Sequence, residues 1–189
     1  MGFRRWFGNR PQKPVRDAVR SHRTDSVLAR AALVTSSVET WALVTRAELL
    51  VVSAPTSANG QDDAAFQEAR SVVVRREWSD VDRATYDTES NVIRVHWADG
   101  DEPTVLALDG RRSVLPQVLR ERVQWSVVLA ESVRLPGERS ARVAVRRRAD
   151  GELFSQVIGG GDVDLADPDI AHVIDAAEAR VRNAAGLPA

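Results

Sequence analysis

The chain of 189 residues contains no cysteine, which excludes disulfide bonds, thiolate nucleophiles and cysteine-ligated metal or iron–sulfur sites. It also has only three histidines, His22, His96 and His172, and no two of them have the spacing of metal ligands. The HExxH and GxSxG motifs are absent. We therefore predict a protein with no catalytic site, no cofactor and no bound metal.

Long apolar runs are missing as well. No segment approaches the ~20 consecutive apolar residues that a membrane-spanning helix requires. The arginine pair at the start of the chain is followed by prolines and charged residues, where an export signal would have an apolar stretch. We expect a cytoplasmic protein, with peripheral attachment to the inner face of the membrane as the alternative location.

What the chain does have is an uneven distribution of charge. Residues 1–24 hold seven cations and one acid, a net charge of +6, so the remaining residues sum to −7. Terminal blocks of one sign usually serve as interaction tails rather than as part of a packed domain. We name residues 1–24 the basic arm and assign it the candidate interaction residues Phe3, Arg4, Arg5, Trp6, Phe7, Arg10 and Lys13.

The rest of the chain shows strand patterns followed by helix patterns, twice over. Apolar runs of strand length predict strands at 27–34, 40–45, 49–53, 70–76, 81–86, 91–97 and 104–108. An apolar stripe at helical spacing then predicts a helix over 114–125, with Ser113 as its N-cap. Turn signals at Pro136-Gly137 and Asp150-Gly151 divide 127–158 into a three-stranded meander, and Asp167 with Pro168 starts a second helix over 168–183.

Three motifs carry a resemblance to a known family. They are Trp41-Ala42-Leu43-Val44-Thr45, its hairpin partner Leu49-Leu50-Val51-Val52, and Trp78-Ser79-Asp80-Val81. With the strand and helix order, they resemble bacterial pleckstrin-homology-like domain proteins of uncharacterised actinobacterial type, and a single lysine among 26 basic residues is typical of such high-GC genomes. The resemblance implies an α+β fold: an antiparallel barrel with a capping helix over 25–126, extended by the meander and C-terminal helix over 127–189.

The resemblance does not extend to phosphoinositide binding, since the loop 34–39 between the first two strands has no basic residue. Other candidate chemistry is equally weak. The glycines at 159–161 are followed by acids, which would repel a phosphate, so we interpret them as a connector. The acids from Asp162 to Asp169 lack the glycine and glutamate of a calcium loop. Arg146-Arg147-Arg148 has the pattern of a solvated strand edge.

Three functional hypotheses remain open. We favour a non-catalytic protein-interaction or scaffold protein with an unknown protein partner. The second hypothesis is attachment to an anionic membrane surface through the basic arm, although a loose tail, or one docked on the acidic body, is an equally plain interpretation of that segment. The third is a barrel that binds a small molecule, with the loop at 54–66 as a lid. Nucleic-acid binding is not expected, because a body of charge −7 opposes it.

Overall fold

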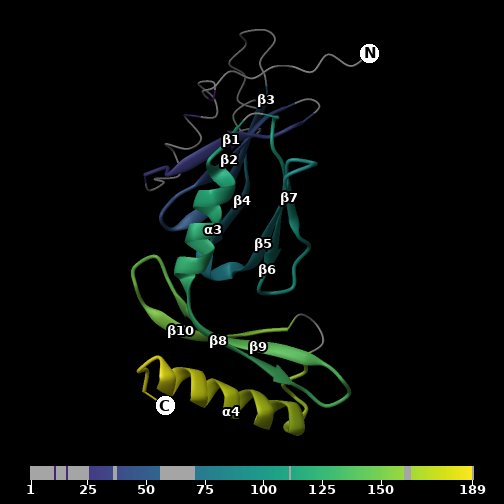
Figure 1. The fold of residues 1–189 in the computed structure, drawn as a ribbon, viewed down its shortest axis with the longest axis vertical. Coiled ribbons are helices and arrows are strands. Elements are labelled where there is room, and N and C mark those ends of the chain that lie inside the picture. The colour runs from purple at the N-terminus through teal and green to yellow at the C-terminus, as the bar shows by residue number, and fades with distance from the viewer. Residues whose placement is uncertain are drawn as a thin grey trace. The chain divides into compact units, whose positions relative to one another are not determined.

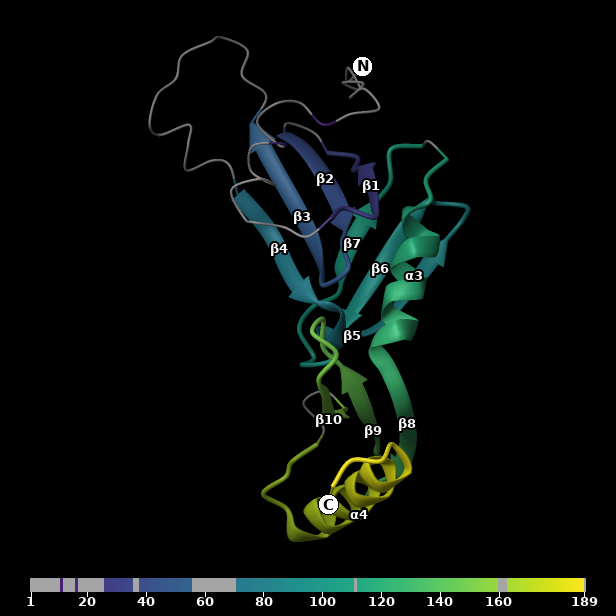
Figure 2. The same ribbon diagram turned by 90° about the vertical axis from the view of Figure 1, so that its left-hand side faces the viewer.

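The fold is known from a computed structural model that describes residues 26–35, 38–55, 71–110, 112–159 and 163–188, together with Pro11 and Arg16. Figures 1 and 2 show the chain in two views. All seven candidate interaction residues of the basic arm lie outside the described residues. The same is true of most of the loop predicted at 54–66.

The described residues form an α+β fold with ten strands, one short 3-10 helix and two longer helices. In chain order the elements are β1 (Ala29–Ala32), β2 (Val38–Val44), β3 (Glu48–Pro55), β4 (Ser71–Glu77), η1 (Trp78–Asp80), β5 (Val81–Asp87), β6 (Val92–Trp97), β7 (Thr104–Ala107), α3 (Leu115–Ser126), β8 (Val127–Arg134), β9 (Ser140–Arg147), β10 (Leu153–Ile158) and α4 (Pro168–Ala184). The α+β prediction, the strand order and both helices are confirmed.

The strands form three antiparallel sheets, in the orders β1-β2-β3-β4, β5-β6-β7 and β10-β9-β8. They do not close into the single barrel that we predicted. Between β4 and β5 the extended backbone is interrupted by η1, whose capping box links Glu77 and Asp80. At the opposite seam, β1 and β7 meet only around an isolated bridge between Leu33 and Leu108.

The chain divides into two compact units. Unit 1 contains the described residues up to Arg76, together with Thr85–Ile93 and Val105–Leu119. Unit 2 contains Glu77–Ala84, Arg94–Thr104 and the described residues from Arg120 onward. Strands β4, β5, β6 and β7 and helix α3 therefore each contribute residues to both units.

The core of unit 1 is built around the β2–β3 hairpin. These strands pair in register from Val38 opposite Pro55 to Val44 opposite Leu49, and their backbone turn is closed by Thr45 and Glu48. Apolar residues on both strands are continuous rather than alternating, so both faces of the hairpin are buried. One face forms the cluster Ala32, Trp41, Leu43, Leu50 and Val52.

Unit 2 is organised around its central strand β9. Val143 and Val145 pack against α4, which contributes the buried stripe Ile170, Ile174, Ala177 and Val181. Figure 1 shows α4 lying along this sheet. On the other face of β9, Ala144 packs against Ala98 and Ile158. Because both faces are covered, almost the whole strand is buried.

The starts of both helices agree with their sequence signals. The Ser113 hydroxyl accepts a hydrogen bond from the Leu115 amide at 3.1 Å, and Pro116 lies in the first turn, where a missing N–H costs little. At α4 the Asp167 carboxylate accepts from the Asp169 amide at 3.0 Å, with Pro168 as the first helical residue. These caps satisfy backbone donors that a helix start leaves without intrahelical partners.

Candidate protein-interaction cleft

The two described histidines lie on different elements, His96 on β6 and His172 on α4. His96 is half-buried on β6, and burial together with the positive charges of Arg83 and Arg94 lowers its pKa below the ordinary value. Among the described residues no three histidine, aspartate or glutamate side chains lie close enough to hold a metal ion. His172 is exposed on α4, and His22 lies outside the described residues.

A cleft does exist in unit 1, where β1 and the segment leading into α3 diverge. It has a volume of about 310 Å³. Its lining comes from β1 and β2 on one side and from the residues after β7 on the other: Arg30, Ala31, Ala32, Trp41, Leu108, Asp109, Arg112, Ser113 and Val114. One end is closed by the Leu33–Leu108 bridge and by the Asp109 amide, which donates to the Ala32 carbonyl at 3.0 Å.

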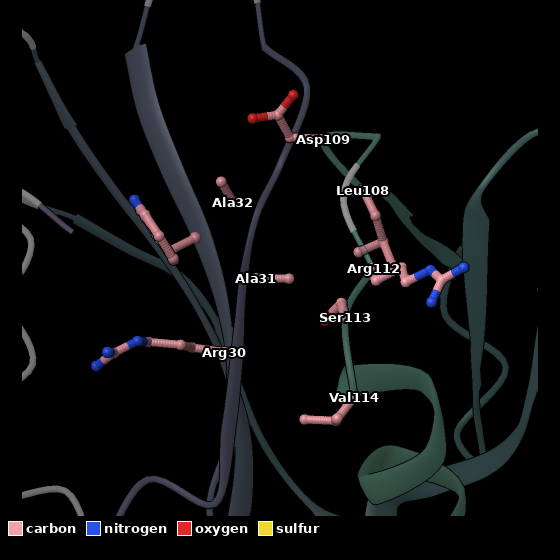
Figure 3. Close-up of a pocket in the computed structure, with 9 residues that line it drawn as sticks. Arg30, Ala31, Ala32, Leu108, Asp109, Arg112, Ser113 and Val114 are labelled. Atoms are coloured by element: carbon pink, nitrogen blue, oxygen red, sulfur yellow. The ribbon is translucent and has the colours of Figure 1, made fainter. Parts of the chain in front are cut away.

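The inner walls of the cleft carry small and apolar side chains. Figure 3 shows Ala31 of β1 and Val114 pointing toward one another across the gap. Trp41 belongs to the lining but is only 3% exposed, and its indole N–H donates to the Glu39 carboxylate at 2.8 Å. Val114, by contrast, is 62% exposed. Apolar surface in this cleft is thus available for contact.

Further exposed apolar side chains lie on the segments that form the cleft. Val27 and Leu28 precede β1, Val34 follows it, and Val105 lies on β7. The Val34 amide donates to the Ala107 carbonyl at 2.8 Å, which brings the end of β1 to β7. Of the eight large hydrophobic residues that are exposed in the described part of the chain, these four belong to β1, β7 and their flanking residues, and a fifth is Val114 in the cleft itself.

Two arginines stand at the rim of the cleft, one on each wall. Arg30 and Arg112 are both exposed, and Figure 3 shows their side chains pointing away from each other. Neither guanidinium forms an ion pair with a residue that the structure describes. Asp109, the acid in the lining, already has an interaction of its own. Among the described residues the rim therefore presents two arginines that no acidic side chain pairs with.

The arginine run 146–148 was the other cluster singled out in the sequence, and its interpretation as a solvated edge is wrong. β9 is the central strand of its sheet, and Arg146 is completely buried. Its Nη2 lies 2.8 Å from the Trp78 carbonyl, 2.7 Å from the Val81 carbonyl and 3.1 Å from the Ser126 hydroxyl. Burial and the nearby charge of Arg142 lower the pKa of Arg146 to about 10, against the opposing effect of Asp80.

The neighbours of Arg146 make different contacts. The Arg147 guanidinium lies 5.0 Å from the centre of the Trp125 ring, and the Arg148 guanidinium lies 4.5 Å from that of Phe154. These are cation–π distances. The run therefore tethers elements within unit 2, and in the described part of the chain the cleft of unit 1 is the better candidate for binding a partner.

Comparison with known proteins adds no relative: no protein-family model, curated protein or solved structure matches the chain. Among the described residues no helix has the length and apolar content needed to cross a membrane.

Proposed function

We propose that the protein is a non-catalytic protein-interaction protein, and that it binds its partner through the β1 cleft of unit 1. The observation that carries this proposal is an open cleft with an exposed apolar lining residue, Val114, together with exposed apolar residues that flank β1 beside it, Val27, Leu28 and Val34. Exposed apolar side chains gathered at a concave site are typical of binding surfaces.

We further propose that the part of the chain from β1 to α3 is a pleckstrin-homology-like module. Its support is the element order: a four-stranded antiparallel sheet, a three-stranded antiparallel sheet and then one amphipathic helix. The meeting of β1 with β7 at one bridge fits an open version of such a barrel. A fold of this kind hosts many unrelated tasks, so the function rests on the cleft and not on the fold.

The proposal is tested by capture of partners from a lysate of the source organism with three forms of the full chain. The forms are the parent protein, Val114→Asp, and the control Leu165→Asp, which changes an apolar residue that is 55% exposed in unit 2. A charge at Val114 opposes apolar contact in the cleft, so we expect this variant to lose a partner that the parent and the control both retain.

Two results would contradict the proposal. One is an identical set of captured proteins for all three forms. The other is a small molecule that co-purifies with the parent and is lost from Val114→Asp without any change in captured proteins, which would favour the small-molecule hypothesis. Thermal unfolding of each form confirms that the substitutions leave the fold intact, since both positions are exposed.

A further inference from the structure

The edge of β1 beside the cleft has backbone hydrogen-bonding groups that no described residue bonds. β1 is the first strand of its sheet and pairs only with β2, in a register that places Ala31 opposite Ala42. The Leu33 amide donates to the carbonyl of Thr40 on β2 at 2.9 Å. In an antiparallel pair, alternate residues direct both their N–H and their C=O to the same side of the strand. The backbone groups of Ala29, Ala31 and Leu33 therefore face β2.

Arg30 and Ala32 consequently direct their backbone groups away from β2. The hydrogen bond from the Asp109 amide to the Ala32 carbonyl agrees with this assignment. The outward amide of Ala32, and the outward amide and carbonyl of Arg30, bond to no residue that the structure describes. A row of unpaired strand groups is a template for a further strand.

We infer that the β1 cleft binds an extended, acidic segment of the partner protein as an added strand. This inference rests on the function proposed above and names the chemistry of the occupant. The backbone of the segment pairs with Arg30 and Ala32, and its small apolar side chains contact Ala31 and Val114. Its carboxylates lie on the opposite face of the segment, beside Arg30, while Arg112 adds positive charge at the far rim.

The charge of the rim selects this occupant over two others from the same chain. The basic arm carries a net charge of +6, so the unpaired guanidinium groups of Arg30 and Arg112 repel it. A second copy pairing through its own β1 would bring two Arg30 side chains close together, and like charges on adjacent strands are destabilising. A segment with glutamate or aspartate at alternate positions is free of both repulsions.

The probe for the test is a fluorescein-labelled octapeptide that alternates glutamate with valine, added to the full chain and followed by fluorescence anisotropy. Two matched peptides accompany it: one with lysine in place of glutamate, and one N-methylated at alternate amides, which keeps the side chains but removes strand hydrogen bonds. We expect only the first peptide to bind, and we expect its binding to weaken as salt is raised.

Substitutions locate the binding on the chain. Arg30→Gln is expected to weaken binding by about two- to five-fold, the effect of losing one exposed charge pair, and Arg112→Gln is expected to weaken it by less, because Arg112 acts only at longer range. Arg134→Gln, which removes an exposed arginine of β8 in unit 2, is expected to leave binding unchanged.

Hydrogen exchange tests the backbone pairing. We expect the amides of Arg30 and Ala32 to exchange freely in the unbound chain and to become protected when the glutamate peptide is added.

Four outcomes would overturn the inference: no binding of the glutamate peptide, equal binding of the lysine peptide, equal binding of the N-methylated peptide, or protection of the Arg30 and Ala32 amides before any peptide is added. The last would mean that the chain itself, for example its basic arm, already covers the edge. If the peptide fails while Val114→Asp still loses a captured partner, strand addition is wrong and the proposed function stands. If Val114→Asp loses nothing, the function itself is wrong.

Discussion

At the scale of single residues, Arg146 shows that the burial of a side chain can depend entirely on tertiary contacts. Arg146 contacts two carbonyl groups, at the start of η1 and the start of β5, and a hydroxyl at the end of α3. The Trp78 carbonyl also accepts from the Val81 amide and the Ser126 hydroxyl, so the guanidinium joins a buried hydrogen-bond network rather than being the sole donor to it. Its Nε and Nη1 have no partner in the described residues. Arg146 therefore acts as a tether within unit 2.

Replacing Arg146 by alanine is expected to lower the free energy of unfolding by about 2–4 kcal/mol, because the change leaves a cavity and removes three buried hydrogen bonds. The matched control is Arg148→Ala, whose side chain is 45% exposed, and which is expected to cost less than about 1 kcal/mol. Urea denaturation of the two variants measures both values. Equal losses would contradict the tether.

His96 gives a prediction about pH. Because burial, Arg83 and Arg94 lower its pKa, the unfolded chain binds a proton at His96 more readily than the folded chain does. The free energy of unfolding therefore falls as the pH drops below the ordinary histidine pKa, and the loss is complete below the folded-state pKa. We expect His96→Gln to lose less stability than the parent between about pH 7.5 and about pH 5.5.

Urea unfolding at those two pH values measures the difference, and NMR titration of the His96 ring gives its pKa directly. Arg83→Gln removes one of the repelling charges and is expected to raise that pKa toward the ordinary value. A His96 pKa above the ordinary value in the parent protein would show that this account of its surroundings is wrong.

At the scale of elements, the two helices are the features that the sequence predicted best. Their apolar stripes, caps and prolines are local signals, and Leu119 on α3 and Ile174 on α4 are buried as the helical spacing implied.

We expect Leu119→Ala and Ile174→Ala each to lower the free energy of unfolding by about 2–5 kcal/mol. The exposed His172→Ala on α4 serves as the control and is expected to change it by less than about 0.5 kcal/mol. Chemical denaturation compares the three variants, and an Ile174→Ala as stable as the control would refute the packing of α4.

The three-stranded meander over 127–158 was predicted from turn signals and is confirmed as β8, β9 and β10, but the division of the earlier strands into two sheets was not predicted. Whether β4 continues into β5 depends on η1, where Trp78 and Ser79 are buried and Glu77 and Asp80 form a capping box. No period in the sequence marks this interruption. The position of β9 at the centre of its sheet likewise depends on pairing with both β8 and β10, which sets the burial of Arg146.

At the scale of the whole molecule, the basic arm remains a hypothesis that rests on sequence. If the arm binds anionic vesicles, an Arg4/Arg5/Arg10→Gln variant is expected to lose binding chiefly at low salt, since salt screens charge. A Phe3/Trp6/Phe7→Ala variant is expected to lose the part of the binding that persists at physiological salt. Vesicle sedimentation of both variants beside the parent makes the comparison, and no difference in either would mean that the arm is not a membrane element.

The candidate site itself was not predictable from the sequence. Arg30 and Arg112 lie far apart along the chain, and each has the appearance of an ordinary surface arginine. Ala31 and Val114 form part of one cleft only because β1 meets the end of β7 at Leu33 and Leu108. The one local signal was the apolar run at 27–34, which continues past both ends of β1 and leaves Val27, Leu28 and Val34 exposed.

The most direct test of the central claim, that a partner protein binds in the β1 cleft, is photocrosslinking in living cells. A benzophenone amino acid is placed at Val114 in one form of the full chain and at Leu165 in another. We predict that the Val114 form crosslinks to one defined protein through an acidic, extended segment, and that adding Arg30→Gln reduces the yield while the Leu165 form gives no such product. The same crosslinked protein from both positions, or none from Val114, would contradict the claim.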